Sequence, residues 1–196
     1  MGVKMSDILS FMKMRRSNLT REMTGPGPSD REIKEIVTIA TRVPDHGKLA
    51  PWRIIYIDQA ASEDIGDLVA SIKAQEGADE HVQEADRARF TKTPTILVVV
   101  SSPIDHPKIP HWEQHLSTGA VCYGALIGAQ AMGFAAQWLT GWAAYNSEVT
   151  ERLGLSSNEK IAGFIHIGQS DHLKLDRARP DLSDVFCLAP NSKRVS

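Results

Sequence analysis

The stretch Thr95-Ile-Leu-Val-Val-Val-Ser101 is a continuous apolar run, and it decides the fold class of this chain. A strand with one face in water alternates apolar and polar residues, and this run does not alternate. We therefore predict a central strand that is buried on both faces. Such a strand needs other elements on each side, which indicates a layered domain of the α/β or α+β class.

The flanking sequence predicts the elements that surround this strand. Further strands are expected at 52–58, 134–139 and 160–168. A capping box, Ser29-x-x-Glu32, opens a helix that Pro44 ends. Other helices are predicted at 6–14, 62–75 and 147–154, and a long buried helix runs from residue 110 or 112 to 132.

Residues 76–93 are polar and charged, with Val82 and Phe90 as the large apolar anchors. This segment is either an exposed helix or a mobile cover over a site. The chain contains no internal repeat and no linker, so we predict one domain over 1–196.

Composition limits the class of partner. The 196 residues carry 22 bases and 24 acids, a net charge of −2, which disfavours nucleic acid and anionic membranes as partners. Cys122 and Cys187 form no CxxC pair, which fits a reducing compartment. The first residues contain no long apolar segment, and 118–136 is interpreted as a core helix and not a membrane span. We expect a cytoplasmic protein.

Arg15-Arg16-Ser17 follows the first predicted helix. One interpretation is a solvated helix end, because cations are favourable at the C-terminus of the helix dipole. The other is a phosphate clamp, since guanidinium groups bind phosphate in a bidentate manner and a hydroxyl adds a donor.

A second cationic junction lies between Thr41 and Trp52. Arg42, His46 and Lys48 fall in one short loop between a helix and a strand. His46 is either a hydrogen-bonded loop residue or part of a site. Together the two junctions point to a phosphorylated, planar, anionic cofactor.

Known nucleotide and catalytic motifs are absent. The chain lacks GxGxxG, GxxxxGK[ST] and the GxSxG elbow, so a nucleotide must be held in another way. His111 and His115 share a helix face, but their spacing reads HxExH and not HExxH, and a third ligand is not apparent. We predict no metal site and expect Trp112 at the edge of a pocket.

These residues resemble the FMN-dependent nitroreductase superfamily, in its small-chain bacterial branch (the YdjA type). The resemblance rests on the order of several markers: Arg15-Arg16-Ser17, Arg42-x-Pro44-Asp45-His46 with Pro51-Trp52, Pro110-x-Trp112-Glu113-Gln114, Gly133-Phe134 with Trp138, and Ile161-Ala-Gly-Phe-Ile-His-Ile-Gly168.

The resemblance implies an α+β fold, a three-layer α/β/α sandwich around a mixed, mainly antiparallel sheet. It also implies an intertwined homodimer with FMN at the subunit interface. Residues 171–196 are then a C-terminal arm that is exchanged in the dimer and docks on the partner subunit.

The same resemblance implies roles for individual residues. Those placed on FMN, some from the opposite subunit, are Arg15, Arg16, Ser17, Arg42, His46, Lys48, Trp138, Leu139, Thr140, Gly141, Arg177 and Arg179. Those placed on the nicotinamide cosubstrate are Gly128, Ala129, Gln130, Ala131, Met132 and Gly133.

The implied activity is a two-step reaction. NAD(P)H passes a hydride to flavin N5, and a nitroaromatic, quinone or similar conjugated acceptor is then reduced, without a dedicated catalytic side chain. Leu139-Thr140 replaces an Arg-Ser pair of the branch, which favours a less anionic or more apolar acceptor. The alternatives are a non-catalytic FMN carrier and a metal hydrolase built on His111 and His115.

Overall fold

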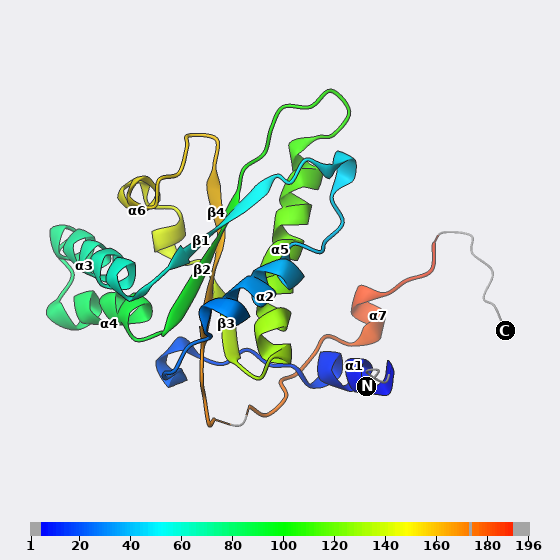
Figure 1. The fold of residues 1–196 in the computed structure, drawn as a ribbon, viewed down its shortest axis with the longest axis horizontal. Helices are drawn as coiled ribbons and strands as arrows, with labels where there is room; N and C mark the ends of the chain where they lie inside the picture. Colours follow the sequence, from blue (N-terminus) through cyan, green and yellow to red (C-terminus); the bar gives the residue numbers. More distant parts are fainter. Residues whose placement is uncertain (1–4, 173, 190–196) are drawn as a thin grey trace.

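The structure is a computed structural model that describes residues 5–172 and 174–189. Its centre is a four-stranded sheet in the order β1-β2-β4-β3 (Figure 1). The strands are β1 (Trp52–Ile57), β2 (Thr95–Ser101), β3 (Ala135–Leu139) and β4 (Lys160–Gly168). All three pairings are antiparallel. The expected mixed sheet is thus corrected, for the described strands, to a purely antiparallel one.

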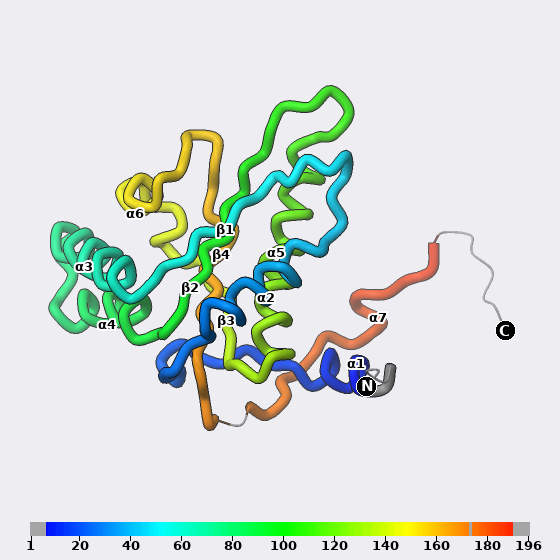
Figure 2. Tube along the Cα trace, viewed as in Figure 1, coloured from blue at the N-terminus to red at the C-terminus, as the bar shows by residue number. Residues whose placement is uncertain are grey.

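The strand β2 has core on both faces, as its apolar run predicts. Leu97 and Val99 pack into one cluster with α2 (Asp30–Ala40) and α5 (His111–Ala131). Ile96 and Val98, which point the other way, pack into a second cluster with α3 (Gln59–Gln75), α4 (Glu80–Thr91) and α6 (Ser147–Arg152). Figure 2 shows these two helical layers on opposite sides of the sheet, so the α/β/α sandwich is confirmed.

Local signals set the boundaries of several helices. In the capping box of α2, Ser29 N donates to Glu32 Oε2 at 2.8 Å, and Glu32 N donates to Ser29 Oγ at 3.4 Å. Asn146 caps α6 by accepting from Val149 N. The small residues of α5 allow close packing: a Cβ on Gly124 would lie 3.0 Å from the backbone Cα and O of Ala40 in α2.

The polar segment 76–93 forms the helix α4, the first of the two structures that its composition allows. Phe90 is 5% exposed and meets Phe164 edge to face, with 5.3 Å between ring centroids. Val82 is 41% exposed, so its predicted role as an anchor is wrong. Phe90 is the apolar anchor of this helix, because it faces the sheet whereas Val82 faces solvent.

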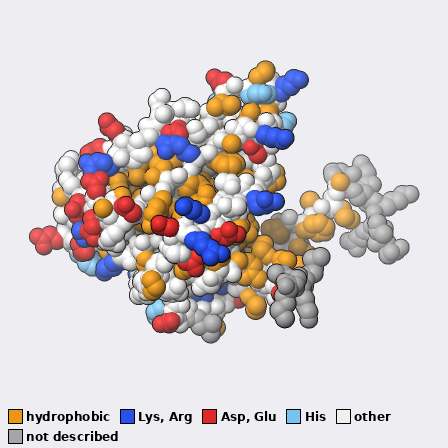
Figure 3. Space-filling model, viewed as in Figure 1, with side chains coloured by type: hydrophobic (Ala, Val, Ile, Leu, Met, Phe, Trp, Pro, Cys, Tyr) orange, Lys and Arg blue, Asp and Glu red, His pale blue; other side chains and the backbone are white. Residues whose placement is uncertain are grey.

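Short elements complete the chain: α1 (Met5–Met14), the 3-10 turns η1 (Thr20–Glu22), η2 (His46–Lys48) and η3 (Trp142–Ala144), and α7 (Leu182–Val185). After β4 the chain leaves the sheet as an arm that carries exposed apolar side chains, among them Leu182, Val185 and Phe186 (Figure 3). Docking of this arm on a partner stays a prediction. Among the described helices, none combines the length and the apolarity needed to cross a bilayer.

Candidate functional site

A cavity of 530 Å³ lies between η1, α4 and the C-terminal end of β3. This volume is within the range of small-molecule sites. Leu139, Thr140 and Gly141 form one wall, and Gly141 turns the chain with a φ of 71°. The strand-end segment that the resemblance assigns to the flavin ring therefore borders a real cavity.

The two tryptophans that bracket this segment have different roles. Trp142 lines the cavity, and its Nε1 donates to Asp86 Oδ2 of α4 at 2.9 Å. Trp138 lies over Gly163 of β4, where a Cβ would be 2.0 Å from the indole nitrogen. Its Nε1 donates to Ala162 O at 3.1 Å, and it is not part of the cavity wall.

The cavity carries positive charge on one side. Arg21, Arg89 and Lys92 border it, and Arg89 is paired with Asp86 at 3.3 Å. His166 of β4 also lines it. Burial, and secondarily the charge of Arg89, lowers the pKa of His166 to about 3, so this ring is neutral at physiological pH. The cavity thus favours an anionic or electron-rich ligand.

Arg15 provides a donor without a partner. Its Nη1 is buried and makes no hydrogen bond to any described residue. An unpartnered buried guanidinium nitrogen is costly, and an anionic ligand would satisfy it. This observation favours the phosphate-clamp interpretation over the solvated helix end.

The segment that holds Arg15 is fastened beside β3. Gln130 Nε2 at the end of α5 donates to Arg16 O at 2.5 Å, and Asn18 N donates to Ala136 O at 3.2 Å. Thr20 N donates to Gln137 Oε1 at 3.0 Å. These bonds fasten the segment to the start of β3 and to Gln137, which lines the cavity. Arg15, Arg16 and the half-buried Ser17 themselves line no part of the cavity.

The other cationic junction lies at the far end of α5. His46 Nδ1 is 2.7 Å from Glu113 Oε2 in the first turn of that helix, whereas Gln130, which binds Arg16, is in its last turn. At a rise of about 1.5 Å per residue, Glu113 and Gln130 are about 25 Å apart along the helix. Within one chain, Arg42, His46 and Lys48 line no part of the cavity. Figure 1 shows the loop between α2 and β1 beside the first turns of α5.

The His46 loop has a defined but strained backbone. Lys48 and Ala50 have φ of 56° and 47°, a region that non-glycine residues seldom adopt. The Asp45 carboxylate accepts from Ala50 N at 2.8 Å and holds the turn. The side chains of His46 and Lys48 are exposed and available to another molecule.

The stretch assigned to the nicotinamide cosubstrate is only partly accessible. Gly128 and Ala129 are buried against α2, and in one copy neither offers surface to a ligand. Gln130 and Met132 are half-buried, while Ala131 and Gly133 are exposed at the turn before β3. Contact of this stretch with a cosubstrate stays a prediction.

The two arginines of the arm are exposed. Arg179 Nη2 lies 2.9 Å from Asp176 Oδ1, and the Arg177 backbone N donates to the same oxygen at 2.8 Å. Asp176 is also 3.8 Å from Arg16 Nη1. The arm thus reaches the N-terminal clamp, although Arg177 and Arg179 line no part of the cavity.

The histidines of α5 have other partners. His111 Nε2 is 3.0 Å from Asp105, and His115 Nδ1 is 2.9 Å from Ser101 Oγ. Over 5–172 and 174–189, no three His, Cys, Asp or Glu side chains gather as a metal site would require. Trp112 is 69% exposed and does not line the cavity, so its place at a pocket edge stays a prediction.

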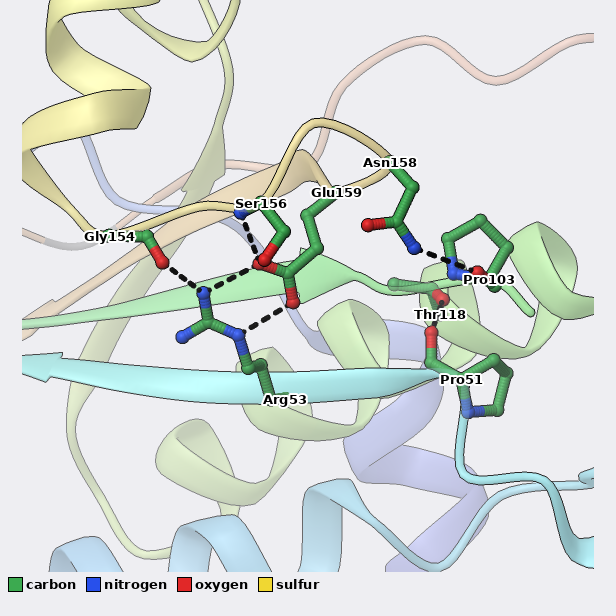
Figure 4. A network of polar contacts seen from close by, with 8 residues as sticks. All are labelled: Pro51, Arg53, Pro103, Thr118, Gly154, Ser156, Asn158 and Glu159. Atoms are coloured by element: carbon green, nitrogen blue, oxygen red, sulfur yellow. Dashed lines mark hydrogen bonds and ion pairs between the residues drawn. The ribbon is translucent and has the colours of Figure 1, made fainter.

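One further polar network is structural. Arg53 of β1 forms a two-pronged pair with Glu159 and also donates to Gly154 O, which ties β1 to the loop before β4 (Figure 4). It does not border the cavity. Sequence reasoning missed several residues that line the cavity, among them Asp86, Arg89, Lys92 and His166. The only signal for the first three was the concentration of charge in 76–93, and His166 carried no signal.

Comparison with known proteins agrees with this geometry. Residues 12–169 match the nitroreductase family. The chain is 27% identical over 162 residues to YdjA of Escherichia coli, whose name assigns it provisionally to the NAD(P)H nitroreductases, covering 83% of this chain and 87% of that protein. A Haemophilus influenzae protein with a similar provisional name is 29% identical over 163 residues, covering 83% and 88%.

Solved structures share the architecture. A nitroreductase-like protein of Bacillus cereus has a TM-score of 0.80 at 25% identity, over 96% of this chain and 98% of that one. A Bacteroides fragilis nitroreductase, solved with bound FMN, has a TM-score of 0.69 at 18% identity, over 94% and 99%. The matched residues span both cationic junctions and the cavity wall, and the chain belongs to the nitroreductase family.

Proposed function

We propose that this chain is an FMN-dependent NAD(P)H oxidoreductase that acts as a homodimer. Family membership and the provisional names of its relatives support an oxidoreductase. The observation that supports FMN as the cofactor is the buried Nη1 of Arg15, which has no partner among the described residues. Arg15 does not line the 530 Å³ cavity, but the same segment reaches the cavity wall at Leu19, Thr20 and Arg21. A phosphate on the ligand fits that donor, and a flat ring system fits the cavity.

When bound, FMN supplies hydride-transfer chemistry between NAD(P)H and an acceptor. The protein contributes binding and electrostatics. Arg15, Arg16 and Ser17 bind the phosphate end, while Leu139, Thr140 and the Gly141 turn border the ring. The backbone donors of that turn orient the ligand, and α4 excludes water from one side.

The cations of the cavity favour a negatively charged ligand. Arg21 and Lys92 border it and make no ion pair with any residue in the described ranges, whereas Asp86 neutralises Arg89. A positive potential in a partly enclosed site stabilises an anion more than it would in water. Leu139, Trp142 and Phe164 add apolar surface, which suits conjugated acceptors such as nitroaromatics and quinones.

The homodimer follows from the distance along α5. Arg15 and His46 lie at opposite ends of a helix segment of about 25 Å, so one cofactor contacts both only if a second copy supplies one of them. The exposed apolar side chains of the arm support the same arrangement. We therefore propose that Arg42, His46 and Lys48 act on the cofactor of the partner subunit.

The test has a binding stage and a turnover stage. The purified chain is mixed with FMN, washed, and the retained flavin is identified by mass. We expect a yellow protein and loss of the flavin colour when NADH or NADPH is added without oxygen. A protein that stays colourless after FMN addition contradicts the proposal, and a yellow protein that neither nicotinamide bleaches is a carrier.

The phosphate assignment has its own variant. Arg15→Gln removes the unpartnered donor and is expected to weaken FMN binding by about 10-fold or more, the usual worth of a charged hydrogen bond. Riboflavin, which has no phosphate, should bind wild type and variant equally. If Arg15→Gln weakens the binding of FMN and of riboflavin equally, Arg15 does not bind the phosphate.

A further inference from the structure

The arm of the chain lies on a cationic residue of the clamp. Arg16 Nη1 donates to the carbonyl oxygen of Leu175 in a close contact and is 3.8 Å from the carboxylate of Asp176. The neighbouring Lys174 pairs with Glu22, the last residue of η1. Residues 174–176 are thereby fastened along the N-terminal segment that holds the clamp.

The Asp176 carboxylate is surrounded by hydrogen-bond donors and positive charge. Its Oδ1 accepts from Arg179 Nη2 at 2.9 Å and from the Arg177 backbone N at 2.8 Å, and it faces Arg16. These same groups, Arg179 first, hold the pKa of Asp176 below its ordinary value, so the carboxylate is charged at physiological pH. One carboxylate thus contacts two arginines from distant parts of the sequence.

We propose that Asp176 is an internal competitor of the cofactor phosphate for Arg16 and Arg179. The inference rests on the proposed function and concerns how the same site is loaded. A carboxylate and a phosphate use the same guanidinium hydrogens. The Asp176 carboxylate therefore weakens the attraction of Arg16 for a phosphate, because it neutralises part of the guanidinium charge. Arg15 Nη1 has no such competitor, since it has no partner among the described residues.

This arrangement makes specific predictions about affinity. Asp176 is exposed, so replacement by Asn removes the charge with little effect on packing. Because exposed ion pairs are worth little, the expected gain is about three- to fivefold in FMN affinity. Riboflavin lacks the phosphate and should bind wild type and Asp176→Asn within about twofold of each other.

The experiment is a fluorescence-quenching titration of the full-length, flavin-stripped chain with FMN and with riboflavin. Asp181→Asn is the matched control. It makes the same charge change on the same arm, and Asp181 forms no ion pair within the described ranges and no side-chain cap on α7. Its FMN affinity should equal that of wild type. Thermal melting of each variant checks that the fold is retained.

A double variant tests whether the effect passes through Arg16. In an Arg16→Gln background the Asp176→Asn gain should shrink, since one of the contested guanidinium groups is absent. Unchanged or weaker FMN binding by Asp176→Asn, or an equal gain for riboflavin, overturns the proposal. Failure of wild type to bind FMN at all would instead overturn the proposed function.

Discussion

Arg53 and Glu159 are joined by two parallel hydrogen bonds, from Nε to Oε1 at 2.7 Å and from Nη2 to Oε2 at 2.8 Å. The Glu159 side chain is 7% exposed and Arg53 is 39% exposed. The bond to Arg53, first among its causes, lowers the pKa of Glu159 from its ordinary 4.5 to about 2. This pair links β1 to the loop that precedes β4.

The pair predicts a pH-dependent loss of stability. Because the folded-state pKa of Glu159 is depressed, its contribution is complete above pH 4.5 and is lost as the pH falls from 4.5 towards 2. Glu159→Gln should lower the free energy of unfolding by about 1–2 kcal/mol at pH 7, with the exposure of Arg53 limiting the effect. Urea unfolding at pH 7 and pH 3 measures it.

The control for this pair is an exposed one. Asp64→Asn breaks the Arg152–Asp64 contact of 2.6 Å, in which both side chains are about half exposed, and should change stability by less than about 1 kcal/mol. If Glu159→Gln lowers the free energy of unfolding as much at pH 3 as at pH 7, the ionised pair is not the source of its effect.

Replacement by alanine should have opposite effects on stability at two glycines of α5. Gly124→Ala places a Cβ 3.0 Å from backbone atoms of Ala40, so α2 and α5 must move apart, at a cost of about 1–3 kcal/mol. Gly119→Ala meets no heavy atom within 4 Å and should stabilise the chain by about 0.5–1 kcal/mol through helix propensity.

Urea unfolding of the two alanine variants under one condition gives the comparison. Destabilisation by both to the same degree would mean that position in the helix, and not the approach of α2, decides the outcome.

The two-subunit site predicts complementation between variants. Arg15→Gln and Arg42→Glu each damage one of the two cationic junctions, and each homodimer should retain little FMN. In a hybrid dimer, one site carries both substitutions and the other site carries neither. The hybrid should therefore bind one FMN per dimer, half of the wild-type amount. The two variants are expressed with different tags, hybrids are purified through both, and bound FMN is counted per dimer.

Hybrids that bind no more flavin than the parent variants would show that Arg15 and Arg42 do not meet on one cofactor. A chain that remains monomeric would have the same meaning.

The two cysteines should differ widely in reactivity. Cys122 is fully buried in α5, and burial raises the pKa of its thiol to about 12. Cys187 is exposed on the arm. Since the thiolate is the reactive form, a disulfide reagent at pH 8 should modify one thiol per chain quickly and the second only on unfolding. If both thiols of the folded protein are modified quickly, Cys122 is not buried in α5 as the structure shows.

The secondary structure could be predicted in most places because its signals are local. The run 95–101 indicated a strand buried on both faces, and the Ser29 capping box indicated the start of α2. Each feature is encoded within a few residues. The error at Val82 concerns which face of a helix meets the core. That depends on neighbours from distant parts of the chain.

The site could be predicted only as separate pieces. The residue types at Arg15 to Ser17 and at 139–141 agreed with a phosphate and a ring, and the family resemblance joined them. The cavity residues of α4, and His166 of β4, carried no motif, because lining a cavity requires a position in space and no particular spacing.

The sequence by itself determined the strands, the capped helices and the two cationic junctions, because periodicity, capping and turn chemistry act over a few residues. The tertiary structure alone decided that these junctions lie at opposite ends of α5, that Arg15 keeps a buried donor without a described partner, and that Asp176 reaches Arg16. Those relationships join residues far apart in the chain, and only the packing of helices against the sheet sets the distances between them.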